Sequence, residues 1–286
     1  MIDLFFQERH ALNTGGIMNI DLGFSPCPND TFIFHALLHG LVDTAGITFR
    51  PHIYDVEELN RRAFSGAYDV TKLSFHAWLL LRDRYALLNS GAALGHGCGP
   101  LVVARDVKTD LAGARIAIPG EYTTACLLLR LWMPEATRVE AVRFDRIMPG
   151  VRDGLYDAGL IIHEGRFVYP QYDLVSLVDL GEWWEKKTSM PIPLGCIAVK
   201  KECPVAVREK INDVLRSSVE FAMGNRDASR DYIRLHAQEL DDQVVNEHIQ
   251  LYVNAFTLDL GDGGREAIRV LEEMARAAGI IGRGVA

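Results

Sequence analysis

The sequence has few cysteines and no long apolar run. Its five cysteines are Cys27, Cys98, Cys126, Cys196 and Cys203. They are scattered, odd in number and without a Cys-x-x-Cys pair, which argues against a disulfide framework and against a zinc site and favours a reducing compartment. No stretch approaches the roughly 20 apolar residues of a membrane-spanning helix. We therefore expect a cytoplasmic protein that has no membrane partner and no metal.

The sequence also lacks an excess of basic residues. Lys and Arg number 30 against 38 Asp and Glu, which gives a formal net charge of −8. Such a chain has no electrostatic footprint for nucleic acid or for an anionic membrane surface. A small anionic ligand would need local donors, such as helix N-termini, hydroxyl groups and a positioned lysine or arginine.

The first 17 residues show neither a signal-peptide pattern nor a fold pattern. Acidic Asp3 and Glu8 interrupt a short apolar run that no small-residue cleavage site follows. Met18 comes directly before the first strand pattern. We expect residues 1–17 to be an extension that is disordered or precedes the native start.

From residue 19 onward, strand patterns alternate with helix patterns. Strands are expected at 19–24, 47–54, 69–73, 85–90, 101–104, 115–119, 139–144, 156–162, 174–180 and 194–200. Helices are expected at 32–39, 55–64, 74–82, 125–132, 145–154, 205–223, 228–236, 242–253 and 264–278. This alternation predicts parallel sheets that are covered by helices.

The order of the elements predicts two lobes. The chain leaves one α/β unit, builds a second and then returns, so it crosses twice between them. We expect a large lobe formed by residues 18–103 and 200–286 and a small lobe formed by residues 104–199. A cleft between two α/β lobes, at the carboxyl ends of the strands, is where a ligand would bind.

Two strand-end loops carry groups that suit an anion. The loop Ser25–Thr31 combines hydroxyl groups with the free N–H groups of a helix start, and its two prolines indicate a rigid shape. Within it, Ser25, Asn29 and Asp30 are the candidate binding residues. Simple capping of the helix is the alternative. In the loop Gly120–Thr124, glycine allows close backbone approach, and of its two threonines one alone would suffice as a cap.

Two further strand ends carry ionisable side chains. Lys72 precedes Leu73 and Ser74, and it would either pair with an anionic ligand or be solvated. His163 follows the apolar strand 158–162, so it is held at the carboxyl end of that strand. Histidine titrates near neutrality and is the commonest general base, although a structural histidine is the alternative. Cys27 could act as a nucleophile with His163 as its base, or it could simply be a small buried side chain.

Three other motifs indicate no chemistry. His35 and His39 have zinc-protease spacing, but the glutamate of that motif is missing and no third ligand is evident. The glycine-rich segment 95–99 precedes a strand, whereas a dinucleotide-binding fingerprint follows one. The pair at 183–184, Trp-Trp, is expected to pack a helix or to form a dimer contact.

Eight segments, taken in order, resemble a known family. They are Ser25–Phe34, Thr71–Ser74, Gly99–Ala104, Thr123–Thr124, Leu160–Glu164, Asp179–Glu185, Pro193–Gly195 and Tyr252–Phe256. This ordered set looks like that of the 1,4-dihydroxy-6-naphthoate synthases of the futalosine route to menaquinone. The resemblance runs from about residue 19 to the last helix. Residues 1–17 have no counterpart in it, and His96 and Cys98 look like variable positions.

The resemblance implies a fold and an activity. The fold would be the two-lobed α/β type of periplasmic solute-binding proteins (type 2), used here for an enzyme with a central ligand cleft. The activity would be a carbon–carbon lyase reaction that converts cyclic dehypoxanthinyl futalosine to 1,4-dihydroxy-6-naphthoate. Lys72, Leu73, Ser74, Thr123 and Thr124 would contact this anionic substrate, and His163 would be the proton acceptor. The resemblance implies neither a metal nor an organic cofactor.

Two alternative functions stay open at this point. One is the chorismate dehydratase of the same pathway, which shares the scaffold. The other is a non-catalytic binding or sensor protein, since a fold alone does not establish catalysis. The oligomeric state also stays open, with a homodimer formed through exposed helices as one expectation.

Overall fold

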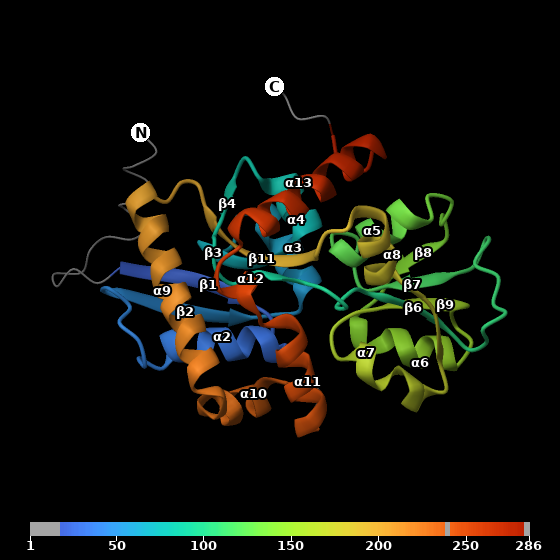
Figure 1. Ribbon diagram of the computed structural model, residues 1–286, viewed down its shortest axis with the longest axis horizontal. Coiled ribbons are helices and arrows are strands. Elements are labelled where there is room, and N and C mark those ends of the chain that lie inside the picture. Colours follow the sequence, from blue (N-terminus) through green and yellow to red (C-terminus); the bar gives the residue numbers. More distant parts are fainter. Residues whose placement is uncertain (1–17, 238–240, 283–286) are drawn as a thin grey trace.

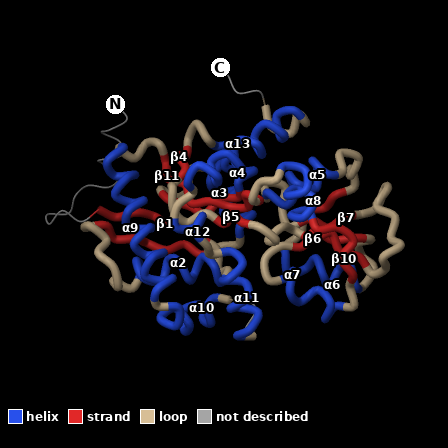
Figure 2. The backbone as a smooth tube through the Cα atoms, in the orientation of Figure 1, coloured by secondary structure: helices blue, strands red, loops and turns tan. Residues whose placement is uncertain are grey.

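The computed structural model of the chain describes residues 18–237 and 241–282. The expected extension, residues 1–17, lies outside this part. Two β-sheets lie next to each other, one with six strands and one with five, and helices cover them (Figure 1). The strands form the middle of each half, with helices on both sides (Figure 2). This arrangement is the predicted two-lobed α/β architecture.

The six-stranded sheet combines the beginning of the chain with a late strand. Its strands are β1 (Met18–Phe24), β2 (Ile47–Ile53), β3 (Val70–Ser74), β4 (Tyr85–Leu87), β5 (Ala93–Gly95) and β11 (Ile192–Lys200). Strands β2, β1 and β3 are parallel neighbours, and β11 runs antiparallel to β3, β4 and β5.

The five-stranded sheet is formed by the middle of the chain. Its strands, in spatial order, are β10 (Val175–Asp179), β6 (Leu101–Ala104), β9 (Ala158–Ile161), β7 (Ile116–Ile118) and β8 (Val139–Ala141). Strands β9, β7 and β8 are parallel, whereas β6 is antiparallel to β9 and β10. The expectation of purely parallel sheets was therefore wrong. Strand β6 is the first strand after the chain leaves the six-stranded sheet, and β11 is the first strand after it returns. Each of these strands enters its sheet at the end opposite to the one where its neighbours begin, so it is antiparallel to them.

The helices confirm most of the predicted periodic segments. The α-helices are α2 (Pro28–Leu38), α3 (Val56–Phe64), α4 (Phe75–Leu81), α5 (Thr124–Trp132), α6 (Ile147–Arg152), α7 (Gly165–Val168), α8 (Leu180–Thr188), α9 (Val205–Gly224), α10 (Arg230–His236), α11 (Asp242–Tyr252), α12 (Ala255–Leu258) and α13 (Gly261–Ala277). Short 3₁₀ turns lie at Phe144–Arg146, Tyr169–Tyr172 and Arg226–Ser229. Strand β5 and helices α7, α8 and α12 were not predicted. Helix α2 begins four residues earlier than expected, at Pro28, so Asn29 and Asp30 lie in its first turn.

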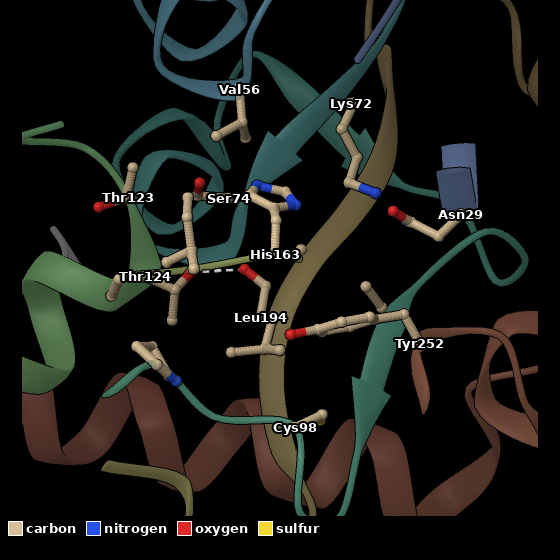
Figure 3. Close-up of a pocket in the computed structure, with 15 residues that line it drawn as sticks. Asn29, Val56, Lys72, Ser74, Cys98, Thr123, Thr124, His163, Leu194 and Tyr252 are labelled. Atoms are coloured by element: carbon tan, nitrogen blue, oxygen red, sulfur yellow. Dashed lines mark hydrogen bonds between the residues drawn. The ribbon is translucent and has the colours of Figure 1, made fainter. Parts of the chain in front are cut away.

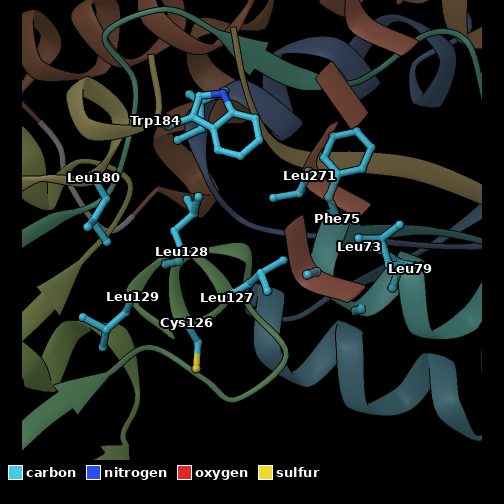
Figure 4. Close-up of a cluster of buried hydrophobic side chains, with 14 of the residues drawn as sticks. Leu73, Phe75, Leu79, Cys126, Leu127, Leu128, Leu129, Leu180, Trp184 and Leu271 are labelled. Atoms are coloured by element: carbon cyan, nitrogen blue, oxygen red, sulfur yellow. The ribbon is translucent and has the colours of Figure 1, made fainter. Parts of the chain in front are cut away.

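One hydrophobic cluster joins the two halves of the molecule. It contains Leu73 and Phe75 from the six-stranded half, and Leu128 and Trp184 from the five-stranded half. Leu271 of α13 belongs to the same cluster (Figure 4). Trp184 is fully buried and donates a hydrogen bond from Nε1 to the Pro191 carbonyl at 3.1 Å, so this tryptophan packs its helix.

The strand pairing refines where we place the lobe boundaries. The predicted small lobe, residues 104–199, would include almost all of β11 and exclude most of β6. Strand β6 instead pairs within the five-stranded sheet, and β11 pairs within the six-stranded sheet. We propose that the chain changes lobes just before β6 and just before β11. In the part of the chain that the structure describes, no helix is both long and apolar enough to cross a membrane.

Candidate active site

A cavity lies where strand ends from both sheets meet. It encloses roughly 560 Å³ including its open mouth. Its lining comprises Asn29, Val56, Lys72, Ser74, Ala93, Cys98, Pro100, Thr123, Thr124, Ala125, Ile162, His163, Leu194, Gly195 and Tyr252 (Figure 3). Both sheets contribute to it, so a ligand bound here would contact both halves of the protein.

Six of the nine predicted site residues line this cavity. They are Asn29, Lys72, Ser74, Thr123, Thr124 and His163. The other three are Ser25, Asp30 and Leu73, which lie outside the lining. The Leu73 side chain is fully buried in the shared hydrophobic cluster because alternate residues of β3 face opposite sides of the sheet.

The loop before α2 holds a buried carboxylate. Asp30 is fully buried, and its Oδ2 accepts hydrogen bonds from Ser25 Oγ at 2.7 Å and from Ser25 N at 3.2 Å. Its Oδ1 accepts a hydrogen bond from Asn29 Nδ2 at 2.9 Å and pairs with the Lys72 ammonium group. Cys27, and not Ser25, occupies the N-cap position of α2, where it makes no side-chain cap. The loop therefore fixes Asp30, and Asp30 holds Lys72 at the cavity.

His163 occupies a left-handed backbone conformation directly after β9. Its φ angle is 57°, an uncommon value for a residue other than glycine. Burial lowers the pKa of its imidazole from 6.5 to about 4; nearby Lys72 lowers it as well, and Asp30 opposes the shift. His163 is therefore neutral at neutral pH and has a free nitrogen lone pair, which is the form that accepts a proton.

A second histidine packs parallel to His163. The ring centroids of His163 and His248 are 6.1 Å apart, and the ring planes differ by 2°. His248 is fully buried, which lowers its pKa well below the usual value. Its Nε2 lies 2.9 Å from Asn29 Oδ1. Because the Asn29 amide nitrogen already donates to Asp30, the amide oxygen faces His248 and the imidazole donates from Nε2. Asn29 thereby connects His248 to the Lys72–Asp30 pair.

The hydroxyl groups at the start of α5 are engaged within the protein. Thr123 Oγ1 donates to the Gly120 carbonyl at 2.8 Å and caps the helix by accepting from Cys126 N at 3.2 Å. Thr124 Oγ1 donates to the Leu194 carbonyl at 2.6 Å, the dashed line in Figure 3. The first N–H groups of an α-helix have no partner inside the helix. An anion at this end would therefore meet the backbone N–H groups of Thr124 and Ala125.

Ser74 presents its hydroxyl group from the opposite half. It was predicted to cap α4, but its side chain makes no cap bond. Instead, Ser74 Oγ accepts a hydrogen bond from Asn60 Nδ2 at 3.0 Å, and Asn60 Oδ1 accepts one from Ser74 N at 2.9 Å. Among the described residues the Ser74 hydroxyl proton has no acceptor, so the group can donate into the cavity.

Cys27 lies beside His163, a proximity that the sequence did not show. Their ligating atoms and a carboxylate oxygen of Glu164 all lie within 4.8 Å of one another. Burial and the neighbouring Glu164 raise the pKa of the Cys27 thiol well above its usual range. Both nucleophilic attack and metal binding require the thiolate, and this environment disfavours it. His35 and His39 belong to no such group within the described residues; their rings pack near Tyr232.

Sequence reasoning did not select Tyr252 as a site residue. It lies at the end of α11, lines the cavity and packs against His248 with ring centroids 4.6 Å apart. His248 and Tyr252 are four residues apart, a spacing that places them on the same face of a helix. This spacing and the family-like segment Tyr252–Phe256 were the available signals, but nothing in the sequence indicated that this face meets His163.

Sequence comparisons with known proteins cover most of the chain. Residues 20–277 match the family described as menaquinone biosynthesis. A 1,4-dihydroxy-6-naphthoate synthase of Thermus thermophilus is 49% identical over 259 residues, which cover 91% of this chain and 94% of that protein. One of Streptomyces coelicolor is 44% identical, with 92% and 94% covered.

Solved structures resemble the whole fold. An Archaeoglobus fulgidus protein is 40% identical with a TM-score of 0.88, and the match covers 92% of this chain and 98% of that one. The alkanesulfonate-binding protein of Xanthomonas axonopodis has a TM-score of 0.68 at 14% identity, with 93% and 94% covered. The latter match confirms the periplasmic-binding-protein-like fold alone. The extent and identity of the sequence matches show that the chain belongs to the menaquinone-biosynthesis family.

Proposed function

We propose that this protein is a carbon–carbon lyase that converts cyclic dehypoxanthinyl futalosine to 1,4-dihydroxy-6-naphthoate, with His163 as the general base. Two relatives at 49% and 44% identity carry the name of this synthase. The observation that carries the proposal is the placement of His163: a neutral imidazole lines the cavity that both sheets form, beside the Lys72–Asp30 pair.

The substrate carboxylate would bind at the start of α5. The N–H groups of Thr124 and Ala125 point out of the helix N-terminus, where the helix dipole favours negative charge. The Ser74 hydroxyl donates from the other half of the protein, and Lys72 adds a positive charge to the cavity. Because these donors come from both halves, binding of an anion would hold the two lobes together.

The proposed chemistry needs a base and a site from which water is excluded. His163 takes a proton from the non-aromatic part of the substrate, a carbon–carbon bond breaks, and formation of the aromatic naphthalenediol drives the step. The remaining carbon fragment leaves as the second product, and the proton is returned to the products, so the step needs no oxidant, reductant or cofactor. A positioned general base typically accelerates such a step by about 10²–10⁴-fold. Lobe closure would exclude water and strengthen the polar contacts.

Incubation of the purified protein with cyclic dehypoxanthinyl futalosine, without added cofactor, tests the reaction. Mass analysis should detect 1,4-dihydroxy-6-naphthoate. Tight binding without product would contradict the lyase proposal and indicate a binding protein. If the protein neither binds nor converts this compound, the substrate assignment is wrong, and chorismate becomes the next compound to test.

Replacement of His163 tests the role of the base. His163→Ala and His163→Asn should each reduce kcat by about 10²–10⁴-fold while the product still binds, because both remove the proton acceptor. Asparagine is included because it tolerates the left-handed backbone that residue 163 adopts. His39→Ala, which removes an exposed histidine of the same protein, is the control. Near-normal turnover by the folded His163→Asn variant would exclude the proposed role.

A further inference from the structure

The hydroxyl group of Tyr252 faces the cavity and makes no hydrogen bond within the described part of the protein. The side chain is 8% exposed, and Figure 3 shows its hydroxyl directed into the cavity. No hydrogen bond links this hydroxyl to any other described residue. Because the hydroxyl is open to the cavity and free to donate, a ligand bound there can supply its acceptor.

The surroundings of Tyr252 suit a strong hydrogen bond. Ala93, Pro100 and Leu194 line the same cavity and offer little polar surface. Burial raises the pKa of the Tyr252 hydroxyl well above its usual value, so the group stays protonated and remains a donor. Once lobe closure excludes water, a hydrogen bond here would be electrostatically stronger than one in water.

The position of Tyr252 also indicates which end of the ligand it meets. In Figure 3 it enters the cavity from the side opposite Thr123 and Thr124. The proposed product carries its carboxylate and its two hydroxyl groups on different rings, and therefore at opposite ends. With the carboxylate at the start of α5, the oxygen atoms of the diol end face Tyr252 and the neighbouring His248–His163 stack.

We infer that Tyr252 is a catalytic residue that donates a hydrogen bond to the substrate oxygen that becomes a hydroxyl group of the naphthalenediol. The inference rests on the proposed function. Negative charge that develops as the new aromatic ring forms is held by the ring oxygen atoms, because these are the electronegative atoms conjugated with the ring. A fixed donor at such an oxygen stabilises the transition state more than the ground state.

Tyr252→Phe removes the hydroxyl and keeps the ring. Removal of one such donor typically lowers kcat by about 10²–10³-fold. We expect kcat to fall by about 10²-fold and KM to change by less than about threefold, because the hydrogen bond strengthens mainly in the transition state. Tyr85→Phe is the matched control, since Tyr85 is also buried but donates its hydrogen bond to the Tyr68 carbonyl, outside the cavity lining. Unchanged kcat in the Tyr252→Phe variant would overturn the inference.

Binding of two ligands tests the contact without relying on activity. The probes are 1,4-dihydroxy-6-naphthoate, kept anaerobic, and 2-naphthoate, which has the same rings and carboxylate but no diol. Tyr252→Phe should weaken binding of the diol by about two- to tenfold, the usual net effect of one hydrogen bond, and leave 2-naphthoate unaffected. Equal losses for both probes, or no loss for either, would overturn the assignment. If the wild-type protein neither binds the diol nor forms it, the proposed function fails, and the inference fails with it.

Discussion

At His163, position and protonation have separate physical causes. The left-handed backbone, with φ of 57°, turns the chain between β9 and α7 and leaves the imidazole at the cavity. Burial, and not a single partner, is the largest cause of its low pKa, because Lys72 and Asp30 act in opposite directions. The side chain is thus held in the neutral form at physiological pH.

The low pKa of His163 predicts an acid limb in the pH profile. In the proposed reaction the neutral imidazole is the active form, so kcat/KM should stay nearly constant from neutral pH down to about 5. It should fall as the pH drops through about 4, where the imidazole becomes protonated. Steady-state rates at each pH would measure this, with circular dichroism to show that the protein remains folded. An acid limb near 6.5 would show that the catalytic histidine is not desolvated in the free protein.

Sequence reasoning located only those site residues that lie at or near the ends of predicted strands. His163 and the threonines were found because each follows a recognisable strand, and Lys72 was found because it lies near the end of one. The role of Asp30, in the first turn of α2, was not predictable, because its partner Lys72 is 42 residues away and lies on strand β3. The contact between Asn29 and His248 joins residues 219 positions apart. Such pairs depend on tertiary packing, which no local pattern encodes.

At the scale of elements, helix α3 holds the loop that leads into α5. The Glu57 carboxylate accepts hydrogen bonds from the backbone N–H groups of Glu121 at 3.0 Å and Tyr122 at 3.2 Å. Gly120, which precedes them, has φ of +153°, and a Cβ atom there would approach the Glu57 side chain to 2.3 Å. The fit between Glu57 and this loop therefore requires glycine. This contact joins the two halves of the protein beside the proposed carboxylate site.

Loss of the Glu57 carboxylate should weaken ligand binding and stability together. Glu57→Ala leaves two backbone N–H groups without acceptors, which should lower the free energy of unfolding by about 1–3 kcal/mol. The affinity for 1,4-dihydroxy-6-naphthoate should fall several-fold, because the start of α5 loses its support. Urea unfolding and calorimetric titration would measure the two effects.

Glu58→Ala is a closely matched control for this variant. Glu58 also lies in the first turn of α3 and also pairs with an arginine four residues later, but it is half-exposed and is not bonded to the loop before α5. We expect its replacement to change stability by less than about 1 kcal/mol and to leave ligand affinity unchanged. Equal behaviour of the two variants would show that the contact between Glu57 and the loop has no role.

The elements themselves were predictable where periodicity was strong. The C-terminal helices α9, α11 and α13 follow their predicted ranges within a few residues, because an apolar stripe marks each one. Helix α8 was missed because its nine residues continue directly from β10, with Asp179 both ending the strand and capping the helix. The antiparallel direction of β6 and β11 was missed because the direction of a strand depends on which end of the sheet the chain enters.

At the scale of the whole molecule, the two halves are not independent. The hydrophobic cluster that contains Leu73 of β3 continues through Leu127 and Leu128 of α5 to Trp184 of α8. Helix α13 adds Leu271 to this cluster (Figure 4). Separation of the halves on this side would expose buried leucine side chains, at a cost of about 1.5–3 kcal/mol each. We therefore expect lobe motion to pivot about this cluster, with the cavity opening on the other side.

A shared core predicts that both sheets lose their structure in one transition. Leu128 is fully buried in the cluster, and Leu128→Ala should lower the free energy of unfolding by about 2–5 kcal/mol. Because the lost contacts stabilise both halves, amide hydrogen exchange in β3 and in β9 should accelerate by the same factor, while replacement of the exposed Leu155 by alanine should change neither. Faster exchange in β9 with unchanged exchange in β3 would mean that the lobes unfold separately. The cluster would then be a contact between two independent cores, and lobe closure would not be limited to a pivot about it.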